Sequence, residues 1–352
     1  QRKRNKRILI QFIKMEENIE NNQNEVTSEN VNFTTRIDLS PLQESIEKIR
    51  AEIGSVIVGQ HKMIDQLLVA ILSNGHVLLE GVPGVAKTIT AKLLAKTLNI
   101  NFSRIQFTPD LMPSDILGTS VYDLKKSEFE FKKGPIFSNL VLIDEINRAP
   151  AKTQAALFEV MEERQITMDG TRYVLDAPFL VIATQNPIEQ EGTYRLPEAQ
   201  LDRFLFKINI DYPKLAEEIL IIQKEHSLQN HGKLDNIKTV LTSEEIQKYQ
   251  ALVKQIIVEP QLLEYIAKLV VNTRENAFLY LGASPRASIA ILNAAKGYAA
   301  IRGRDFVTPE DIKEAAVPVL QHRVIVTPER EMEGITSTQI IKQVIEAIEI
   351  PR

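Results

Sequence analysis

The stretch Gly81-Val82-Pro83-Gly84-Val85-Ala86-Lys87-Thr88 decides the fold of this chain. It follows a short apolar run at residues 77–79 and precedes a helical pattern over residues 89–98. In a glycine-rich loop between a strand and a helix, backbone N–H groups and the helix N-terminus can bind a phosphate group. We therefore predict a phosphate-binding loop inside a parallel α/β sheet that includes the preceding strand.

Within this loop, Lys87 is expected to reach the β- and γ-phosphates of a nucleotide, and the Thr88 hydroxyl is expected to bind Mg²⁺. Ala86 stands where glycine is expected, and we expect it to be tolerated only if its φ angle is negative. A chance glycine-rich turn is the alternative, which the residues discussed next make less attractive. The predicted nucleotide contacts in this segment are Gly81, Val82, Pro83, Gly84, Val85, Ala86, Lys87, Thr88 and Ile89.

A second buried strand ends in two acids. Residues 140–143 form a continuous apolar run, and Asp144 and Glu145 follow it directly. Two adjacent carboxylates at the end of an apolar strand are costly unless they are used. We predict that Asp144 holds Mg²⁺ and that Glu145 polarises the attacking water. An exposed helix start would explain the charges, but not their place beyond an apolar strand.

Three further residues are candidates for the same site. Asn186 follows the apolar run at residues 179–182 and is placed to orient the water or contact the γ-phosphate; a turn residue before proline is its alternative. Arg203 is predicted to neutralise the γ-phosphate of a neighbouring subunit, with an ordinary paired arginine as the alternative. Arg286 opens a helix and is predicted to lie across the nucleotide, with a solvated first-turn arginine as the alternative.

The chain is predicted to divide into three parts. Residues 1–40 are predicted to be a disordered tail, because residues 15–35 are rich in Glu and Asn with few apolar residues; Met15 is a plausible natural start. Residues 41–212 begin with two helical patterns and then alternate short apolar runs with helices, which predicts an α/β nucleotide-binding domain. Residues 213–352 show no strand signals and predict a smaller all-α domain. Its expected helices cover residues 215–224, 243–258, 261–271, 286–301 and 309–317.

Two hairpins are predicted within the α/β domain. Asp169-Gly170 is a two-residue turn between alternating flanks over residues 165–174, which is the strongest short hairpin signal. A second hairpin, with strands at 120–124 and 128–131, is predicted in an insertion between residues 110 and 135. Purely structural hairpins without partner contacts are the alternative for both.

Composition excludes some functions. The chain has 352 residues, a net charge of −4 and no Cys, which excludes disulfides and thiolate metal sites. The acidic balance disfavours non-specific nucleic-acid binding. The longest clean apolar stretch, residues 67–72, is far shorter than the roughly 20 residues of a membrane span. We expect a cytoplasmic protein.

Together these motifs resemble a known family. The order of Val58-Gly59-Gln60, the phosphate loop, the two acids, Asn186 and the two arginines resembles that of AAA+ ATPases. Among AAA+ ATPases, the MoxR family is the one that four segments resemble in amino-acid sequence. The resemblance extends from about residue 41 to the end. These segments are residues 81–88, 143–150, 183–187 and 196–204. Ala86 before the lysine is common in MoxR-like loops.

The resemblance assigns roles to the candidate residues. It implies that Asn186 is sensor 1, that Arg203 is the arginine finger and that Arg286 is sensor 2. Gly59 and Gln60 are implied to lie near the adenine of ATP. The hairpin at 165–174 resembles the one that precedes sensor 1. The insertion between residues 110 and 135 resembles the helix-2 insert, which lines or caps the central pore in related rings.

The resemblance also implies a biological role. It implies a homo-oligomer, a hexameric ring, that hydrolyses ATP with Mg²⁺ to remodel or mature protein complexes. A separate protein with a von Willebrand factor A domain is the implied partner, because residues 38–42 lack the full metal motif of such a domain. A metal-chelatase motor subunit and a nucleic-acid motor are the alternatives. Zinc-ligand spacing, a helix-turn-helix signature and a basic–aromatic stripe are not evident in the sequence, so direct contact with nucleic acid is not expected.

Overall fold

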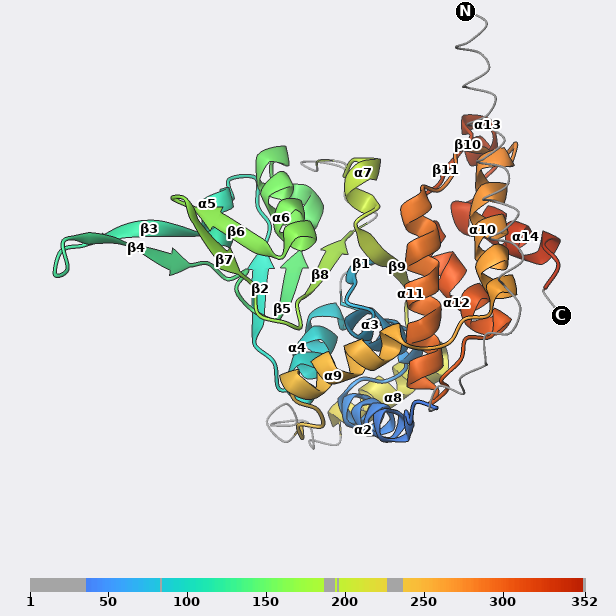
Figure 1. Cartoon of the computed structure of the whole chain (residues 1–352), viewed down its shortest axis with the longest axis horizontal. Coiled ribbons are helices and arrows are strands. Elements are labelled where there is room, and N and C mark those ends of the chain that lie inside the picture. Colours follow the sequence, from blue (N-terminus) through green and yellow to red (C-terminus); the bar gives the residue numbers. More distant parts are fainter. Residues whose placement is uncertain (1–35, 83, 187–193, 195, 227–236, 351–352) are drawn as a thin grey trace, which may run out of the picture. The chain divides into compact units, whose positions relative to one another are not determined.

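The computed structural model describes residues 36–350 except 83, 187–193, 195 and 227–236 (Figure 1). Most of the predicted disordered tail, residues 1–35, lies outside the described residues. The compact unit that contains the sheet begins at Ile37 rather than at residue 41. Leu39 is buried in its core, so the last residues assigned to the tail belong to the folded unit.

A parallel sheet forms the centre of this unit. In the described residues it has five strands, in the spatial order β2-β5-β8-β1-β9, and every neighbouring pair is parallel. The predicted strands are confirmed as β1, β5 and β8, whereas β2 and β9 have no counterpart among the predictions. The bounds are β1 (His76–Gly81), β2 (Phe102–Gln106), β5 (Leu140–Asp144), β8 (Leu180–Gln185) and β9 (Phe204–Ile210).

Both faces of the sheet are buried. Successive strand residues point to opposite faces, so Leu142 joins one core cluster while Val141 and Ile143 join the other. The first cluster packs against α2 (Ser40–Val56), α3 (His61–Leu72) and α4 (Lys87–Thr97), and the second packs against α6 (Ala151–Glu163). Burial on both faces explains why the central strands read as unbroken apolar runs.

The second half of the chain is helical and packs directly on the sheet domain. Gly297 allows α11 to lie close to α3, because a Cβ at this position would come within 2.7 Å of Val69 Cγ1. The helices of this second half are α8 (Leu215–His226), α9 (Ser243–Lys254), α10 (Pro260–Glu275), α11 (Pro285–Ile301), α12 (Pro309–Leu320), α13 (Pro328–Met332) and α14 (Ser337–Ala347).

This helical lid is not entirely α-helical, which corrects the prediction. β10 (Leu279–Leu281) and β11 (Ile325–Val326) form an antiparallel pair within it. Strands this short give no recognisable alternation in sequence, because their pairing depends on two loops that only the packing of the helices brings together. None of the described helices is long and apolar enough to cross a membrane.

Both predicted hairpins are confirmed. β6 (Gln165–Met168) and β7 (Thr171–Val174) are joined by Asp169 and Gly170, whose φ angles are 50° and 76°, as a type I′ turn requires. β3 (Gly118–Asp123) and β4 (Glu128–Lys133) form the longer hairpin, preceded by α5 (Pro113–Leu117). The rings of Phe131 and Tyr173 lie 4.5 Å apart between centroids, so the two hairpins lie side by side (Figure 1).

Candidate active site

The sheet brings the phosphate loop and the two acids together. β8 is the one strand between β1 and β5 in the described sheet, so the loop after β1 and the acids at the end of β5 meet at the carboxyl edge. Lys87 Nζ donates to the carbonyl oxygen of Gly81 at 2.7 Å. Partial burial lowers the pKa of Lys87, whereas the nearby carboxylates of Asp144 and Glu145 raise it. The three charges therefore interact.

β8 and β2 hold Asp144 in place. Thr184 Oγ1 donates to Asp144 Oδ1 at 3.2 Å, and the backbone N–H of Glu145 donates to the same Thr184 hydroxyl at 3.0 Å. Arg104 Nε lies 2.6 Å from Asp144 Oδ2. Asp144 is thus a buried carboxylate with fixed orientation, and Asn186 follows β8 at the same edge of the sheet.

Glu145 is held by two side chains that sequence reasoning did not identify. Gln106 Nε2 donates to Glu145 Oε2 at 2.8 Å, and Arg148 Nε lies 2.9 Å from the same oxygen. Gln106 and Arg104 both come from β2, which pairs with β5. Arg104 and Gln106 alternate with other residues of this short segment, as residues on one face of a strand do. Because the segment is largely polar, it was not recognised as a strand.

The backbone of the phosphate loop differs from the expectation. Ala86 has a φ angle of +63°, so the prediction of a negative φ is wrong. The loop turns into α4 through this left-handed residue, and Gly84 also has a positive φ of 87°. Gln60 and Glu145 share this conformation. Such strain in residues other than glycine is frequent at functional sites. Pro83 lies outside the described residues.

Ala86 is therefore expected to reject a β-branched side chain. We expect Ala86→Val to lower the free energy of unfolding by about 2 kcal/mol, because a branched Cβ is poorly tolerated at positive φ. Ala86→Gly should remain within about 1 kcal/mol of the original, since relief of strain offsets the added chain entropy. Urea denaturation measures both variants. Equal stabilities of the Val and Gly variants would contradict the left-handed conformation.

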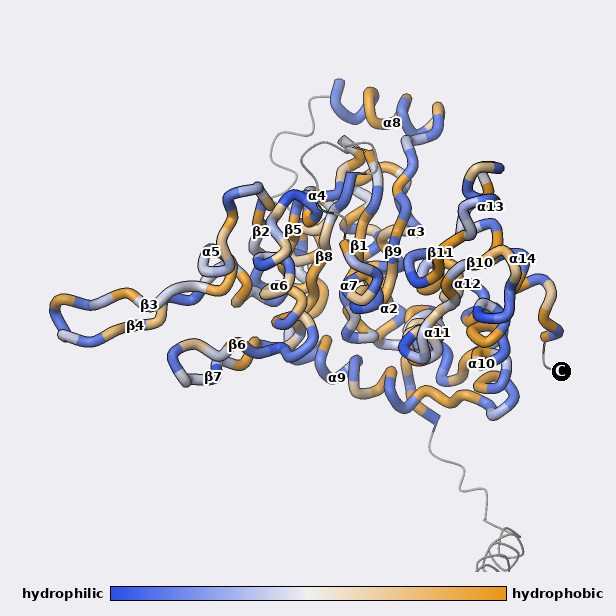
Figure 2. The backbone as a smooth tube through the Cα atoms, turned by 90° about the horizontal axis from the view of Figure 1, so that it is seen from above, coloured by the Kyte–Doolittle hydropathy of each residue, from blue (hydrophilic) through white to orange (hydrophobic). Residues whose placement is uncertain are grey.

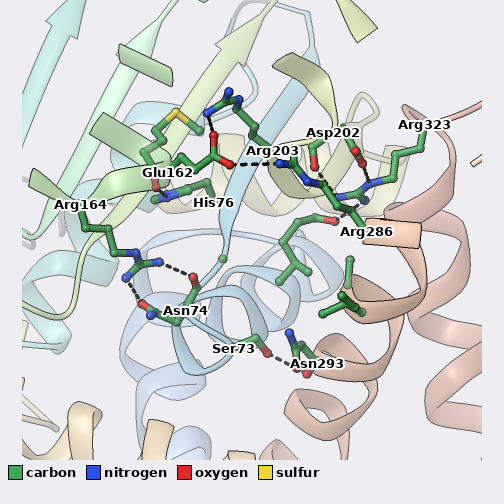
Figure 3. Close-up of a pocket in the computed structure, with 15 residues that line it drawn as sticks. Ser73, Asn74, His76, Glu162, Arg164, Asp202, Arg203, Arg286, Asn293 and Arg323 are labelled. Atoms are coloured by element: carbon green, nitrogen blue, oxygen red, sulfur yellow. Dashed lines mark hydrogen bonds and ion pairs between the residues drawn. The ribbon is translucent and has the colours of Figure 1, made fainter. Parts of the chain in front are cut away.

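The two predicted arginines share one carboxylate on α6. Arg203 Nη1 pairs with Glu162 Oε2, and Arg286 Nη2 lies 3.1 Å from Glu162 Oε1 (Figure 3). They line a cavity of about 290 Å³ that we call the arginine pocket. Among its lining residues are His76, Glu162, Arg164, Asp202, Arg203, Arg286, Ile289 and Arg323. Glu162 was not among the predicted site residues, because its spacing in α6 resembles that of a solvated acid.

The arginine pocket lies at the amino ends of the sheet strands, whereas the phosphate loop lies at their carboxyl ends. His76, the first residue of β1, lines it, whereas the loop follows Gly81, the last. Six extended residues span roughly 17 Å. Arg203 and Arg286 are therefore remote from Lys87 of their own chain. For Arg286 this differs from the expectation that it lies across its own nucleotide.

The lid reaches the arginine pocket through Asp202. Arg323 Nε lies 2.6 Å from Asp202 Oδ1, and Ser284 Oγ donates to Asp202 Oδ2 at 2.9 Å. Both partners belong to the lid, and Arg323 is almost fully buried. The position of the neighbouring Arg203 is thus coupled to the packing of the lid.

Gly59 and Gln60 lie beside the first lid helix. A Cβ at Gly59 would clash with Glu217 Oε1 on α8. Shortly before α8, residues 209–212 line a cavity of about 330 Å³ together with Gly81 and Val82. There is thus space next to the beginning of the phosphate loop. Val85 packs into the core, and Thr88 and Ile89 form the first turn of α4.

Comparison with known proteins agrees with this geometry. The family model described as "ATPase family associated with various cellular activities (AAA)" matches residues 76–206, and the AAA lid domain model matches residues 271–344. YeaC of Bacillus subtilis is 45% identical, covering 89% of this chain and 96% of that protein. Chaperone MoxR1 of Mycobacterium tuberculosis is 43% identical, covering 88% and 83%.

A solved structure extends the comparison to three dimensions. A crystal structure of a protein from Cytophaga hutchinsonii, assigned as an ATPase, has a TM-score of 0.82 and 44% identity, covering 88% of this chain and 96% of the other. The two family models match in the same order as the sheet domain and the helical lid of this chain, and the solved structure shares its fold. This chain belongs to the MoxR family of AAA+ ATPases.

Proposed function

We propose that copies of this chain form a closed ring in which Arg203 and Arg286 of one copy complete the nucleotide site of the next. One observation supports this proposal. Both arginines form ion pairs with Glu162 at the amino ends of the sheet strands, whereas Lys87 of their own chain lies at the carboxyl ends. A heterologous contact that repeats from copy to copy generates a closed ring when its rotation closes. The family resemblance favours a hexamer.

Within each site, the residues at the carboxyl edge fit ATP and Mg²⁺. The Thr88 hydroxyl and the Asp144 carboxylate are hard oxygen donors, and Mg²⁺ commonly uses only one or two protein ligands besides phosphates and water. The ion would neutralise charge on the phosphate oxygens. Lys87 would bind the β- and γ-phosphates, and Asn186 would orient water or phosphate. Glu145, held by Gln106 and Arg148, would accept a proton from the attacking water.

The cavity beside the phosphate loop is our proposed position for the adenine. Gly81 and Val82 form one side and residues 209–212 another. Gly59 and Gln60 would close this region from the N-terminal side, since Gly59 contacts α8, which begins shortly after residue 212. A base bound there would be contacted by both the sheet domain and the first lid helix.

We propose that the protein uses the energy of ATP hydrolysis to remodel or mature protein complexes. The name of the chaperone relative supports this role. The β3–β4 hairpin projects away from the sheet and exposes Tyr122, Leu124 and Phe129 beside several lysines (Figure 1). Exposed aromatic and aliphatic side chains at a projecting tip suit contact with a polypeptide. By family resemblance, the partner is a separate protein with a von Willebrand factor A domain.

A nucleotide-trapped pull-down tests the remodelling role. With ATP, a Glu145→Gln chain is expected to retain a von Willebrand factor A protein identified by mass spectrometry. Adding Leu124→Ser and Phe129→Ser is expected to reduce its recovery about tenfold, because two exposed apolar contacts of the hairpin are removed. Adding Met332→Ser, a comparable change on α13, should leave recovery unchanged. Retention of no such protein, or equal recovery with both variants, would contradict the role given to the hairpin.

A further inference from the structure

Helix α8 carries an apolar surface that no described part of its own chain buries. None of its residues is buried. In Figure 2 it stands apart from the sheet, with hydrophobic and hydrophilic stretches along it. The exposed fractions of its large aliphatic residues are Leu215 78%, Ile219 46%, Leu220 49%, Ile221 39% and Ile222 62%.

The aliphatic turn of α8 is unusual for a surface that faces water. Residues 219–222 are four consecutive aliphatics, and at about 100° per residue they occupy most of the circumference. A helical turn that is apolar nearly all round is normally buried, although the rest of α8 carries polar and charged residues. An isolated helix of this length is marginal in water. Exposed apolar surface of this kind is a typical contact site for another surface.

Polar contacts join α8 to the segment that precedes α3. Lys224 Nζ donates to the carbonyl oxygens of Gly54 and Ser55, each at 3.2 Å. Glu217 lies against Gly59. These contacts anchor α8 beside the segment that precedes α3, while its large aliphatic side chains stay exposed by 39% to 78%.

The position of α8 indicates which surface covers it. It follows residues 209–212, which line the cavity beside the phosphate loop. In the proposed ring, the arginine pocket of the neighbouring copy must approach this same loop, because its arginines act there. The neighbouring copy is therefore the body that comes closest to α8.

The two surfaces are complementary in charge. In α8, Glu217, Glu218 and Glu225 outnumber Lys224, which leaves a net charge of −2 with His226 neutral. The arginine pocket has four arginines against Glu162 and Asp202. Its His76 is neutral, because burial lowers the pKa of this residue to about 3. The pocket is thus positive where α8 is negative.

The arginine pocket also offers an apolar contact. Ile289 lines it on α11 and is 60% exposed. We propose that the aliphatic surface of α8 docks beside the arginine pocket of the next copy, so that α8 is the assembly element of the ring. This inference rests on the proposed function, because it places the neighbour by the requirement that Arg203 and Arg286 reach its phosphate loop.

The double variant Ile219→Gln/Ile222→Gln tests this inference. Glutamine keeps a high helix propensity, so α8 itself should be preserved. With ATP and Mg²⁺, sedimentation velocity should show that the dissociation constant of the oligomer rises roughly 100-fold, because two buried aliphatic side chains are lost from each contact. ATP hydrolysis per subunit should fall at low protein concentration and recover at high concentration. Met332→Gln on α13 is the matched control and should assemble normally.

Two outcomes would overturn the inference. One is that the double variant assembles and hydrolyses ATP like the original chain. The other is that it melts at a lower temperature at a dilution where the original chain is monomeric, which would mean that its own chain covers α8. Neither outcome would affect the role of Arg203, which subunit mixing tests separately. Conversely, weakened assembly of the double variant would support α8 even if mixing failed.

Discussion

Mixing two inactive variants, Lys87→Ala and Arg203→Ala, is expected to restore ATP hydrolysis. Lys87→Ala removes the ammonium group that we propose binds the phosphates, so this chain should not bind ATP, but it still presents Arg203. Arg203→Ala retains the complete carboxyl edge of the sheet and should bind ATP normally. One complete site forms wherever the first chain presents its arginine to the second. Hydrolysis by the mixture, after subunit exchange is verified with labelled chains, measures this complementation.

The expected effect of Arg203→Ala alone is large. An arginine that stabilises charge on the transferred phosphoryl group contributes roughly 10³ to 10⁵ in rate. It contributes less to binding in the ground state, so affinity for ATP, measured by calorimetry, should change little. The structure supports action on a neighbour, because Arg203 lies at the sheet edge remote from its own Lys87.

The control for this prediction is Arg330→Ala, which removes an arginine from α13 in the lid. It should hydrolyse ATP like the original chain. Normal hydrolysis by Arg203→Ala would show that another residue is the arginine finger. A mixture that stays inactive despite verified exchange would contradict action between neighbouring copies.

Glu145→Gln is expected to bind ATP tightly and to turn it over about 10² to 10⁴ times more slowly. The change removes the carboxylate that we propose accepts a proton from water. The amide oxygen can still accept the hydrogen bond from Gln106, and Asp144 keeps its contacts with Arg104 and Thr184. Binding and turnover should therefore separate cleanly, which single-turnover kinetics with excess enzyme would measure.

Glu159→Gln is the matched control, because Glu159 lies on the exposed side of α6. Its turnover should equal that of the original chain. Steady-state hydrolysis near the original rate in Glu145→Gln would mean that a different group activates the water. The assignment of Glu145 would then be withdrawn, whereas the phosphate loop would be unaffected.

Central strands and turns could be predicted because their signals are local. β1, β5 and β8 are continuous apolar runs, since both of their faces are covered by helices. The turn at Asp169-Gly170 requires two residues that tolerate positive φ, and this pair is well suited to it. The proximity of Lys87 to Asp144 could also be predicted, because the carboxyl ends of parallel strands lie at the same edge of a sheet.

β2 could not be predicted in this way. It is an edge strand with an incompletely buried pattern, and Arg104 and Gln106 interrupt its apolar residues. These same residues contact Asp144 and Glu145. The polar residues that made the strand hard to recognise in the sequence are thus the ones that support the candidate site. β9 was missed because its polar Lys207 and Asn209 interrupt the apolar run in the same manner.

The sequence by itself determined the class of fold, the phosphate loop and the acids beyond β5, because each depends on neighbours in the chain. Only the tertiary structure decided that Ala86 adopts a positive φ. It also decided that Glu162 joins Arg203 to Arg286, and that this pair lies across the sheet from Lys87. These features depend on strand order and on where α6 ends and α11 begins in space. No local pattern encodes such distances, because they result from packing between segments far apart in the chain.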